Sequence, residues 1–350
     1  MKTNNETIYG IQSSPERYTL LTWTVTVLIT SLLGDGIIVL ASIKHNAIKL
    51  HKVIVVVIQH LAVCNLLLTT VVVFPTTVAL IADRWVLGEA LGHLHVLVRS
   101  TCYPAQRVLT CVMTTLKVLL LKYPLRTASW SRGTGHRICG LMWVVVICVY
   151  LPLQFGVMLF IWDNLQFDFA SYACIYDYSS TRAPGWLRHY NLMYINLVIV
   201  VPCVVLLVTS LFILVKAKVA AARYRGTLRW EGVLTVLITV GVLFAAFLPF
   251  CAVFVARDLG HLNTTIYRGA NFLNFLNIMA NFFVYCFTVN SFRAYLKSGV
   301  VGLVRRVSLK KRRVPPQYVK GGSLAPTTTI DEQLPLSPDV ETRTFHKTFV

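Results

Sequence analysis

Long apolar runs separated by short polar connections dominate the pattern of this chain. A helix rises about 1.5 Å per residue and the hydrocarbon core of a bilayer is about 30 Å thick, so about 20 apolar residues can cross it. The runs that reach this length occupy residues 20–43, 53–82, 90–121, 138–162, 191–215, 232–256 and 269–292. The pattern predicts an all-α membrane protein built as a seven-transmembrane-helix bundle.

The composition agrees with this prediction and narrows the function. Of the 350 residues, 56% are hydrophobic and 13% are charged, about half the charged share of a soluble domain. This shortage of charge excludes a disordered chain, a nucleic-acid-binding tail protein and most soluble two-domain enzymes. The chain shows no internal repeat, so we expect an N-terminal segment at 1–19, one transmembrane domain at 20–292 and a cytoplasmic region at 293–350.

The few charged residues are unevenly distributed. Lys and Arg number 33 and Asp and Glu 14, which gives a net charge of +19. Of the basic residues, 24 lie in the first, third and fifth connections, at the foot of the third run and after the seventh. Because basic loops stay in the cytoplasm, the pattern predicts a multi-pass plasma-membrane protein with an extracellular N-terminus. The same charges favour contact with anionic membrane lipids.

Short motifs outside the apolar runs predict modification and partner sites. Two sequons, at Asn5 and Asn263, fall on the predicted outer side and are candidates for glycosylation. Ser308 follows a pair of arginines in the form that basophilic kinases favour. The segment from Thr348 to Val350 fits a PDZ ligand, and the Pro/Thr/Ser-rich stretch before it is expected to be disordered.

The third run carries a polar face on an otherwise apolar helix. Residues at spacings of three, four and seven form one stripe, made of Arg99, Tyr103, Gln106, Arg107, Thr110, Thr114 and Lys117. In lipid such a face must turn inward, so we expect this helix to lie at the centre of the bundle.

Arg99 is the leading candidate for a ligand contact. An unpaired arginine in the membrane costs about 2.5 kcal/mol or more, and no acid in the apolar runs is placed to neutralise this one. In one interpretation, Arg99 receives the carboxylate or phosphate of an anionic small molecule, lipid or peptide. In the other, its side chain reaches outward to Glu89, Asp163, Asp168 or Asp177. For Arg107 we expect a buried carbonyl, an amide or Asp35 as the partner.

Eight motifs follow one another in an order that is typical of one receptor family. They are Gly34-Asp35, Leu61-Ala62-Val63-Cys64-Asn65-Leu66, Trp85 with Gly88, Lys122-Tyr123-Pro124-Leu125-Arg126, Trp143, Pro202, Phe247-Leu248-Pro249-Phe250, and Asn281-Phe282-Phe283-Val284-Tyr285 before Phe292-Arg293. Together, over about residues 20–297, they resemble the rhodopsin-like family of G-protein-coupled receptors.

The resemblance implies a receptor and not an enzyme, with no cofactor and no metal. It implies an extracellular ligand, a heterotrimeric G protein, arrestin, and an amphipathic helix 8 at about 291–304. The residues expected to bind the ligand are Arg99, Tyr103, Gln106 and Phe247. The residues expected at the G-protein-coupling surface are Lys117, Arg126 and Arg229.

A polar core is expected where the first, second and seventh runs meet. The family pairs an Asn in the first span with an Asp in the second, and here Asp35 and Asn65 exchange those types. We expect the buried carboxylate to take donors from neighbouring amides. The core residues are Asp35, Asn65, Arg107, Asn277, Asn281 and Tyr285. A hinge that moves and a purely structural network both remain open, and Gln106 beside them makes a sodium site unexpected.

Departures from the family pattern keep a second function open. Leu116-Lys117-Val118 stands where the family has Asp-Arg-Tyr, Gly92 where it has a disulfide-forming Cys, Arg229 where many members have an acid, and Phe282 where it has Pro. The alternative is a constitutively active receptor, a decoy or a receptor chaperone without ordinary G-protein coupling. A transporter would need inverted repeats or gating acids, and the sequence shows neither.

Overall fold

The computed structural model describes residues 15–44, 48, 50–161, 165–168, 172–176, 201–223, 230–258 and 264–299. Within these ranges, the side chains at 121, 149–161, 166, 168, 175–176, 217–223, 230–233, 236, 254–258 and 264 are not described. Residues up to Lys297 form one compact unit, and the chain from Ser298 onward forms a second.

The described helices follow the seven apolar runs. The first run lies in α1 (Pro15–Ile43), the second in α2 (Lys52–Leu68), η1 (Thr69–Val73) and α3 (Phe74–Ala82), and the third in α4 (Glu89–Lys122). The short α5 (Pro124–Thr127) precedes α6 (Arg132–Ile161), which is followed by α8 (Val201–Arg223) and α9 (Trp230–Asp258). The seventh run lies in α10 (Thr264–Leu273) and α11 (Leu276–Thr288). Residues 191–200 of the fifth run lie outside the described ranges.

The second helical segment contains one wide turn that the sequence pattern did not predict. Pro75 lies near the start of α3 and has no N–H, and its ring crowds the carbonyl one turn earlier. The chain responds with the π-helical η1 directly before it, where the wider turn makes room for the ring. At its start, the hydroxyl of Thr69 donates to the carbonyl oxygen of Asn65 at 2.8 Å, which also accepts from the Thr69 backbone N–H.

The seventh segment is broken, although its run predicts one continuous span. Between α10 and α11, Asn274 and Phe275 form a tight turn in which the Phe275 N–H donates to the carbonyl oxygen of Phe272 at 3.1 Å. The helix ends at Thr288, four residues before the predicted end, because Val289 is extended. Residues 290–299 are helical again, and the rest of the expected 291–304 helix lies outside the described residues.

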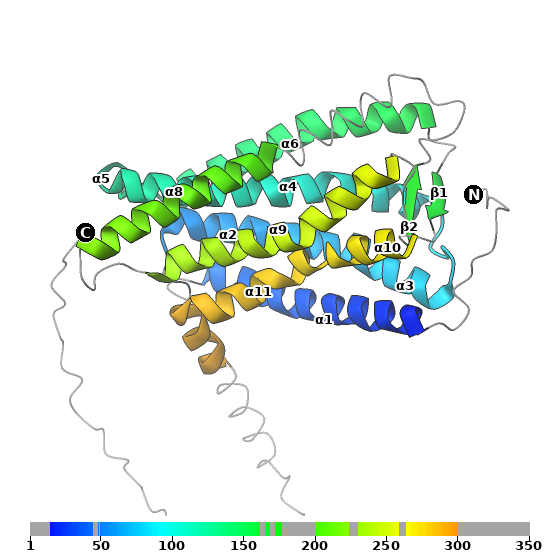
Figure 1. Ribbon diagram of the computed structural model, residues 1–350, viewed down its shortest axis with the longest axis horizontal. Coiled ribbons are helices and arrows are strands. Elements are labelled where there is room, and N and C mark those ends of the chain that lie inside the picture. Colours follow the sequence, from blue (N-terminus) through cyan, green and yellow to red (C-terminus); the bar gives the residue numbers. More distant parts are fainter. Residues whose placement is uncertain are drawn as a thin grey trace, which may run out of the picture. The chain divides into compact units, whose positions relative to one another are not determined.

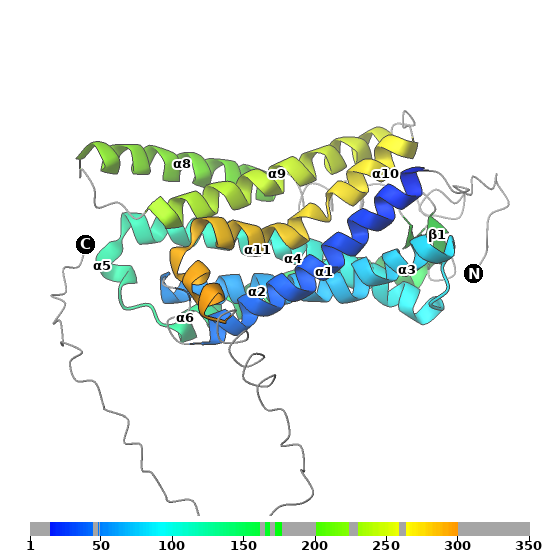
Figure 2. The same ribbon diagram turned by 90° about the horizontal axis from the view of Figure 1, so that it is seen from below.

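A two-stranded hairpin follows α6. Strands β1 (Leu165–Asp168) and β2 (Ala173–Tyr176) are antiparallel, with Phe167 opposite Cys174. The pattern of apolar runs did not predict this hairpin, which lies between the fourth and fifth runs. The long helices lie side by side, with α5 at one end of the bundle and the hairpin at the other (Figures 1 and 2).

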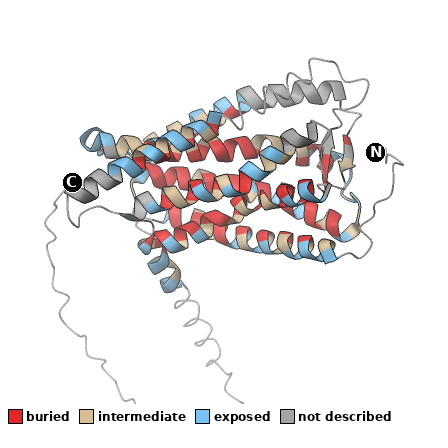
Figure 3. Ribbon diagram, viewed as in Figure 1, coloured by how far each residue is buried: buried red, intermediate tan, exposed pale blue. Residues whose placement is uncertain are grey.

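Helix α4 occupies the centre, as its polar stripe predicts. It packs against α2, α6, α8 and α9, and the middle of the stripe, from Tyr103 to Thr114, is buried. Figure 3 shows buried residues where helices face one another and exposed residues on their outward faces.

Among the described helices, three segments have both the length and the apolarity to cross a membrane: Pro15–Ile43, Lys52–Ala82 and Thr265–Thr288. Two apolar stretches, Val201–Lys216 and Leu237–Val253, are shorter. The 34-residue α4 is long enough to cross, but it carries the charges of the polar stripe.

Candidate functional site

The carboxylate of Asp35 lies in a hydrogen-bonded network between α1 and α2. Its Oδ2 accepts from the Ser31 hydroxyl at 2.7 Å, and its Oδ1 accepts from Asn65 Nδ2 at 3.3 Å. Asn65 also donates to the carbonyl oxygen of Ile278 on α11 at 3.1 Å. The expected contact between Asp35 and Asn65 is therefore present. Because Asp35 and Asn65 are both buried, each bond replaces water that the polar groups have lost.

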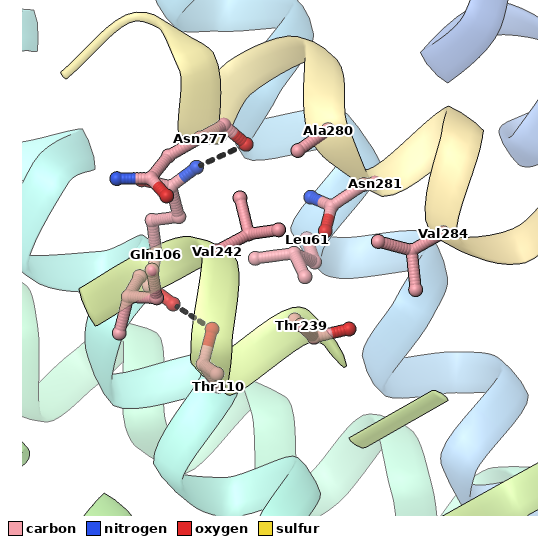
Figure 4. Close-up of a pocket in the computed structure, with 10 residues that line it drawn as sticks. Leu61, Gln106, Thr110, Thr239, Val242, Asn277, Ala280, Asn281 and Val284 are labelled. Carbon is pink, nitrogen blue, oxygen red and sulfur yellow. Dashed lines mark hydrogen bonds between the residues drawn. The ribbon is translucent and has the colours of Figure 1, made fainter. Parts of the chain in front are cut away.

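Gln106 connects this network to the central helix. Its Nε2 donates to Asn65 Oδ1 at 2.9 Å and to the carbonyl oxygen of Asn277 at 3.4 Å. Figure 4 shows Gln106 reaching from α4 toward Asn277 beside a cavity that Asn281 and Thr239 also line. The cavity has a volume of about 10 Å³, which is room for about one water molecule.

Two expected members of the polar core have other roles than predicted. The amides of Asn277 and Asn281 were expected to donate to Asp35, but the donors are Ser31 and Asn65. Asn277 Nδ2 turns instead to Asn274 Oδ1 at 3.3 Å. The Tyr285 hydroxyl is buried without a hydrogen-bond partner among the described residues. One turn of α1 thus supplied a donor, Ser31, that the sequence analysis missed.

Arg99 contacts a residue that the sequence analysis did not consider. Its Nη2 donates to the side-chain oxygen of Asn271 on α10 at 2.7 Å. Among the described side chains, no carboxylate lies within ion-pair distance of this guanidinium. Of the four acids considered, Glu89 faces His93 at 3.6 Å, while Asp163, Asp177 and the side chain of Asp168 are not described. A neutral amide orients the guanidinium without cancelling its charge.

Arg107 contacts two aromatic rings, which the sequence pattern did not predict. Its guanidinium carbon lies 3.4 Å from the centroid of the Phe247 ring and 6.0 Å from that of Tyr103. Phe247 is fully buried. The ring that was expected to face a ligand is therefore covered by an arginine of the same chain.

Two departures from the family motifs are matched by changes in packing. A Cβ built on Gly34 would lie 2.6 Å from the Cβ and Cγ of Phe282, so the phenyl ring in place of proline fits only against a glycine. A Cβ built on Gly92 would lie 3.1 Å from Cys174 Sγ. The cysteine of the hairpin thus lies opposite a residue without a thiol. All nine cysteines lie in the described ranges and are free.

A chain of polar contacts joins the outer ends of α1, α3, α10 and the hairpin. Glu16 pairs with Arg268 at 2.9 Å, and the Arg268 guanidinium lies over the Tyr172 ring. The Tyr172 hydroxyl donates to Asp83 at 3.4 Å, and Asp83 lies 4.0 Å from Arg17. Burial, with Asp83 nearby, raises the pKa of Tyr172 to about 12. Asp83 and Tyr172 are the described non-glycine residues with positive φ, so these contacts hold a strained backbone.

At the opposite end, the expected coupling residues lie on α4 and α5. Lys117 is half-buried, and its ammonium has no hydrogen bond or ion pair with the described residues; Arg126 is exposed. His51 bonds through Nε2 to the carbonyl oxygen of Thr127 at 3.2 Å. Burial lowers the pKa of His51, and Lys117 and Lys52 lower it further. Outside the described residues lie Arg229, Asn5, Asn263, Ser308, Thr348 and Val350.

The comparison with protein families identifies the fold and the receptor class together. Residues 35–292 match the family described as 7 transmembrane receptor (rhodopsin family). The match covers most of the chain and includes the Asp35–Asn65 contact, the α4 stripe and α11. A search of curated proteins found no significant match. The chain belongs to the rhodopsin family of seven-transmembrane receptors.

Proposed function

We propose that this protein is a plasma-membrane receptor that passes the signal of an extracellular ligand to a heterotrimeric G protein. Family membership supports a receptor rather than an enzyme. The seven apolar runs support seven spans, and the basic connections support a cytoplasmic location for the α5 end. The hairpin and the N-terminus then lie outside the cell.

The ligand in this proposal carries an anionic group that Arg99 receives. The observation that supports it is the 2.7 Å bond to Asn271. Asn271 fixes the direction of the guanidinium but leaves its charge, so the remaining N–H donors favour a carboxylate or phosphate. Arg99 lies ten residues inside the start of α4, about 15 Å along the helix, so the anionic group must enter the bundle to reach it. The competing partners whose side chains are not described, Asp163, Asp168 and Asp177, belong to the outer connection.

The cytoplasmic end offers a docking surface for the G protein. Leu125 on α5 is 91% exposed, and an apolar side chain in such a position is a suitable anchor for a partner. Arg126 beside it is exposed, and Lys117 lacks an ion-pair partner among the described side chains. These groups can accept acidic and carbonyl oxygens of a docked helix. Arrestin at the same face and a PDZ domain on the segment from Thr348 to Val350 are further proposed partners.

G-protein activation in cells tests the ligand proposal. Dodecanoate and dodecyl phosphate serve as anionic probes, and dodecanol is the neutral control of equal length. We expect a response to an anionic probe and none to dodecanol. The response falls at least tenfold in Arg99→Gln and in Asn271→Asp, where a carboxylate neutralises Arg99. Asn271→Ala, which keeps the charge, retains a weakened response.

The experiment is completed by measuring surface expression and by testing the variants Asp163→Asn, Asp168→Asn and Asp177→Asn. If Arg99 pairs with one of these acids, removing that acid increases the response to the anions. A response to dodecanol equal to that to dodecanoate, or an Arg99→Gln variant with wild-type sensitivity, would contradict the anionic ligand. Absence of any G-protein signal from a well-expressed receptor would favour the receptor-like decoy or chaperone instead.

A further inference from the structure

Three aromatic rings connect α2 to α6 in the half of the bundle that ends at α5. Trp143 Nε1 donates to His60 Nδ1 at 3.3 Å, and His60 Nε2 lies 3.3 Å from His136 Nδ1. The imidazole rings meet edge to face, with centroids 5.5 Å apart. Gly135, next to His136, lets the helices approach, since a Cβ there would lie 3.0 Å from Val56 Cβ. This contact is separate from the Asp35 network and from the α4 stripe.

The indole fixes where each proton lies. An indole N–H donates and cannot accept, so His60 Nδ1 must be the acceptor and carry no proton. The proton of neutral His60 is therefore on Nε2, and it is donated to His136 Nδ1. His136 in turn carries its own proton on Nε2. The three rings form a one-directional chain of donors, and both imidazoles are neutral in it.

A proton on His136 breaks this chain. Protonated imidazole has an N–H at both nitrogens, so Nδ1–H of His136 would face Nε2–H of His60. His60 cannot move its proton to Nδ1 without facing the indole N–H. The same restriction disfavours a metal ion on these two nitrogens, because a metal on His60 Nε2 requires the proton on Nδ1.

The charges around His136 strengthen the destabilising effect of a proton on this ring. His136 is exposed and His60 is half-buried, so protons reach the outer ring. The charged and titratable groups with described side chains at this end include Arg132 and Arg137 beside His136 on α6, His51 and Lys52 at the start of α2, Lys117 and Lys122 on α4, and Arg126 on α5. The acids with described side chains are Glu16, Asp35, Asp83 and Glu89, and each lies elsewhere in the bundle. A new positive charge on His136 therefore meets basic neighbours and no compensating carboxylate among the side chains that the structure describes.

We propose that Trp143, His60 and His136 form a proton-sensitive clasp, which holds α6 against α2 while both imidazoles are neutral and opens when His136 is protonated. The clasp goes beyond the proposed ligand and coupling functions, and it does not depend on either. In the orientation proposed above, it senses acidity on the cytoplasmic side. Its input is the proton itself.

Two substitutions separate the clasp from general acid sensitivity. In His136→Asn, the side-chain oxygen replaces Nδ1 as acceptor and cannot take up a proton, so the contact persists in acid. In Trp143→Phe, His60 is free to move its proton to Nδ1 and accept from protonated His136, so the helices also stay joined. Trp23→Phe is the matched control, since it removes an indole bond to the Phe272 carbonyl oxygen, on α1 instead of at the clasp.

The test is the thermal unfolding midpoint of the purified full chain in phosphatidylcholine nanodiscs, at pH 7.5 and pH 5.5. These values lie on either side of about 6.5, where imidazole titrates in water. Loss of one hydrogen bond lowers the midpoint by about 2 °C. Wild type and Trp23→Phe should show this extra fall in acid, and His136→Asn and Trp143→Phe should not. Equal falls in wild type and His136→Asn would overturn the clasp. Equal falls in wild type and Trp143→Phe would overturn the role of the indole.

Discussion

The guanidinium of Arg107 lies 3.4 Å above the centre of the Phe247 ring and joins the middle of α4 to α9. Phe247 precedes Pro249 by two residues, and this proline lies inside α9, where the missing backbone bond allows the helix to bend. Arg107 is 5% exposed, so the ring faces a cation that has lost most of its water. The contact thus sets where α9 rests against the central helix.

A double-mutant cycle measures this contact. Phe247→Leu leaves the buried cation without its ring, whereas Arg107→Leu removes the cation itself. We expect the two changes to be coupled by about 1–2 kcal/mol in the free energy of unfolding, so that the double variant is more stable than the sum of the single losses predicts. Chemical unfolding in detergent gives the four values. If the losses in the free energy of unfolding are additive, the two side chains do not interact favourably with each other.

The glycine beneath Phe282 predicts a sharp difference between two neighbouring substitutions. Gly34→Ala places a methyl group 2.6 Å from Phe282 Cβ and should destabilise the fold by about 2 kcal/mol. Gly36→Ala, two residues along the same helix, has nothing within 4 Å. It should be neutral or stabilise the helix by up to about 1 kcal/mol. The thermal unfolding midpoints of both variants test this difference in stability. Similar midpoints would contradict the close packing of Phe282 against Gly34.

The hairpin cysteine predicts that a disulfide can be restored. In a disulfide, each Cβ lies about 3 Å from the far sulfur, and a Cβ on Gly92 would lie 3.1 Å from Cys174 Sγ. Gly92→Cys should oxidise spontaneously with Cys174 and stabilise the protein by about 2–4 kcal/mol. Mass spectrometry of unreduced peptides detects the bond. Gly92→Ser is the control of nearly equal size, and two free thiols in oxidised Gly92→Cys would show that the hairpin is placed elsewhere.

The exchange of Asp and Asn between α1 and α2 predicts that two substitutions compensate for each other in stability. Asn65→Asp sets two carboxylates 3.3 Å apart or less and should cost about 3 kcal/mol or more. Asp35→Asn keeps an acceptor for the Asn65 amide and should cost about 1 kcal/mol. The double variant Asp35→Asn/Asn65→Asp should recover most of the loss of Asn65→Asp. Unfolding midpoints test this, and failure of the double variant to exceed Asn65→Asp would contradict the observed pairing.

Local sequence patterns predicted the features that depend on one helix. The apolar runs placed the long helices, and spacings of three and four on α4 predicted which face turns inward. The Asp35–Asn65 contact was predicted because the family resemblance supplied the pairing. The boundaries were less accurate, since α1 and α9 extend beyond their apolar runs and α11 ends at Thr288.

Contacts between distant helices were not predictable from those patterns. Asn271 faces Arg99, and Phe247 faces Arg107, because packing sets the rotation of α10 and α9 about their axes. An arginine within an apolar helix indicates that its guanidinium needs a partner. Its position in the sequence does not indicate which amide or ring of another helix will lie opposite. The ring-on-glycine contact of Phe282 has the same origin, because it depends on how α1 and α11 pack. The π turn is instead a local response to Pro75 within one helical segment, and the apolar pattern carries no sign of it.

Lys117 gives the most direct test of the central claim, that this chain is a receptor that couples to G proteins. G-protein activation is measured in cells that express wild type, Lys117→Ala or Lys117→Arg at equal surface levels, without ligand and with the anionic probes. Wild type should signal above untransfected cells. Loss of a charge-assisted contact of about 1.5–3 kcal/mol should lower the signal of Lys117→Ala at least about tenfold, while Lys117→Arg keeps it. No signal from surface-expressed wild type under any condition, or an unchanged signal from Lys117→Ala, would contradict the account.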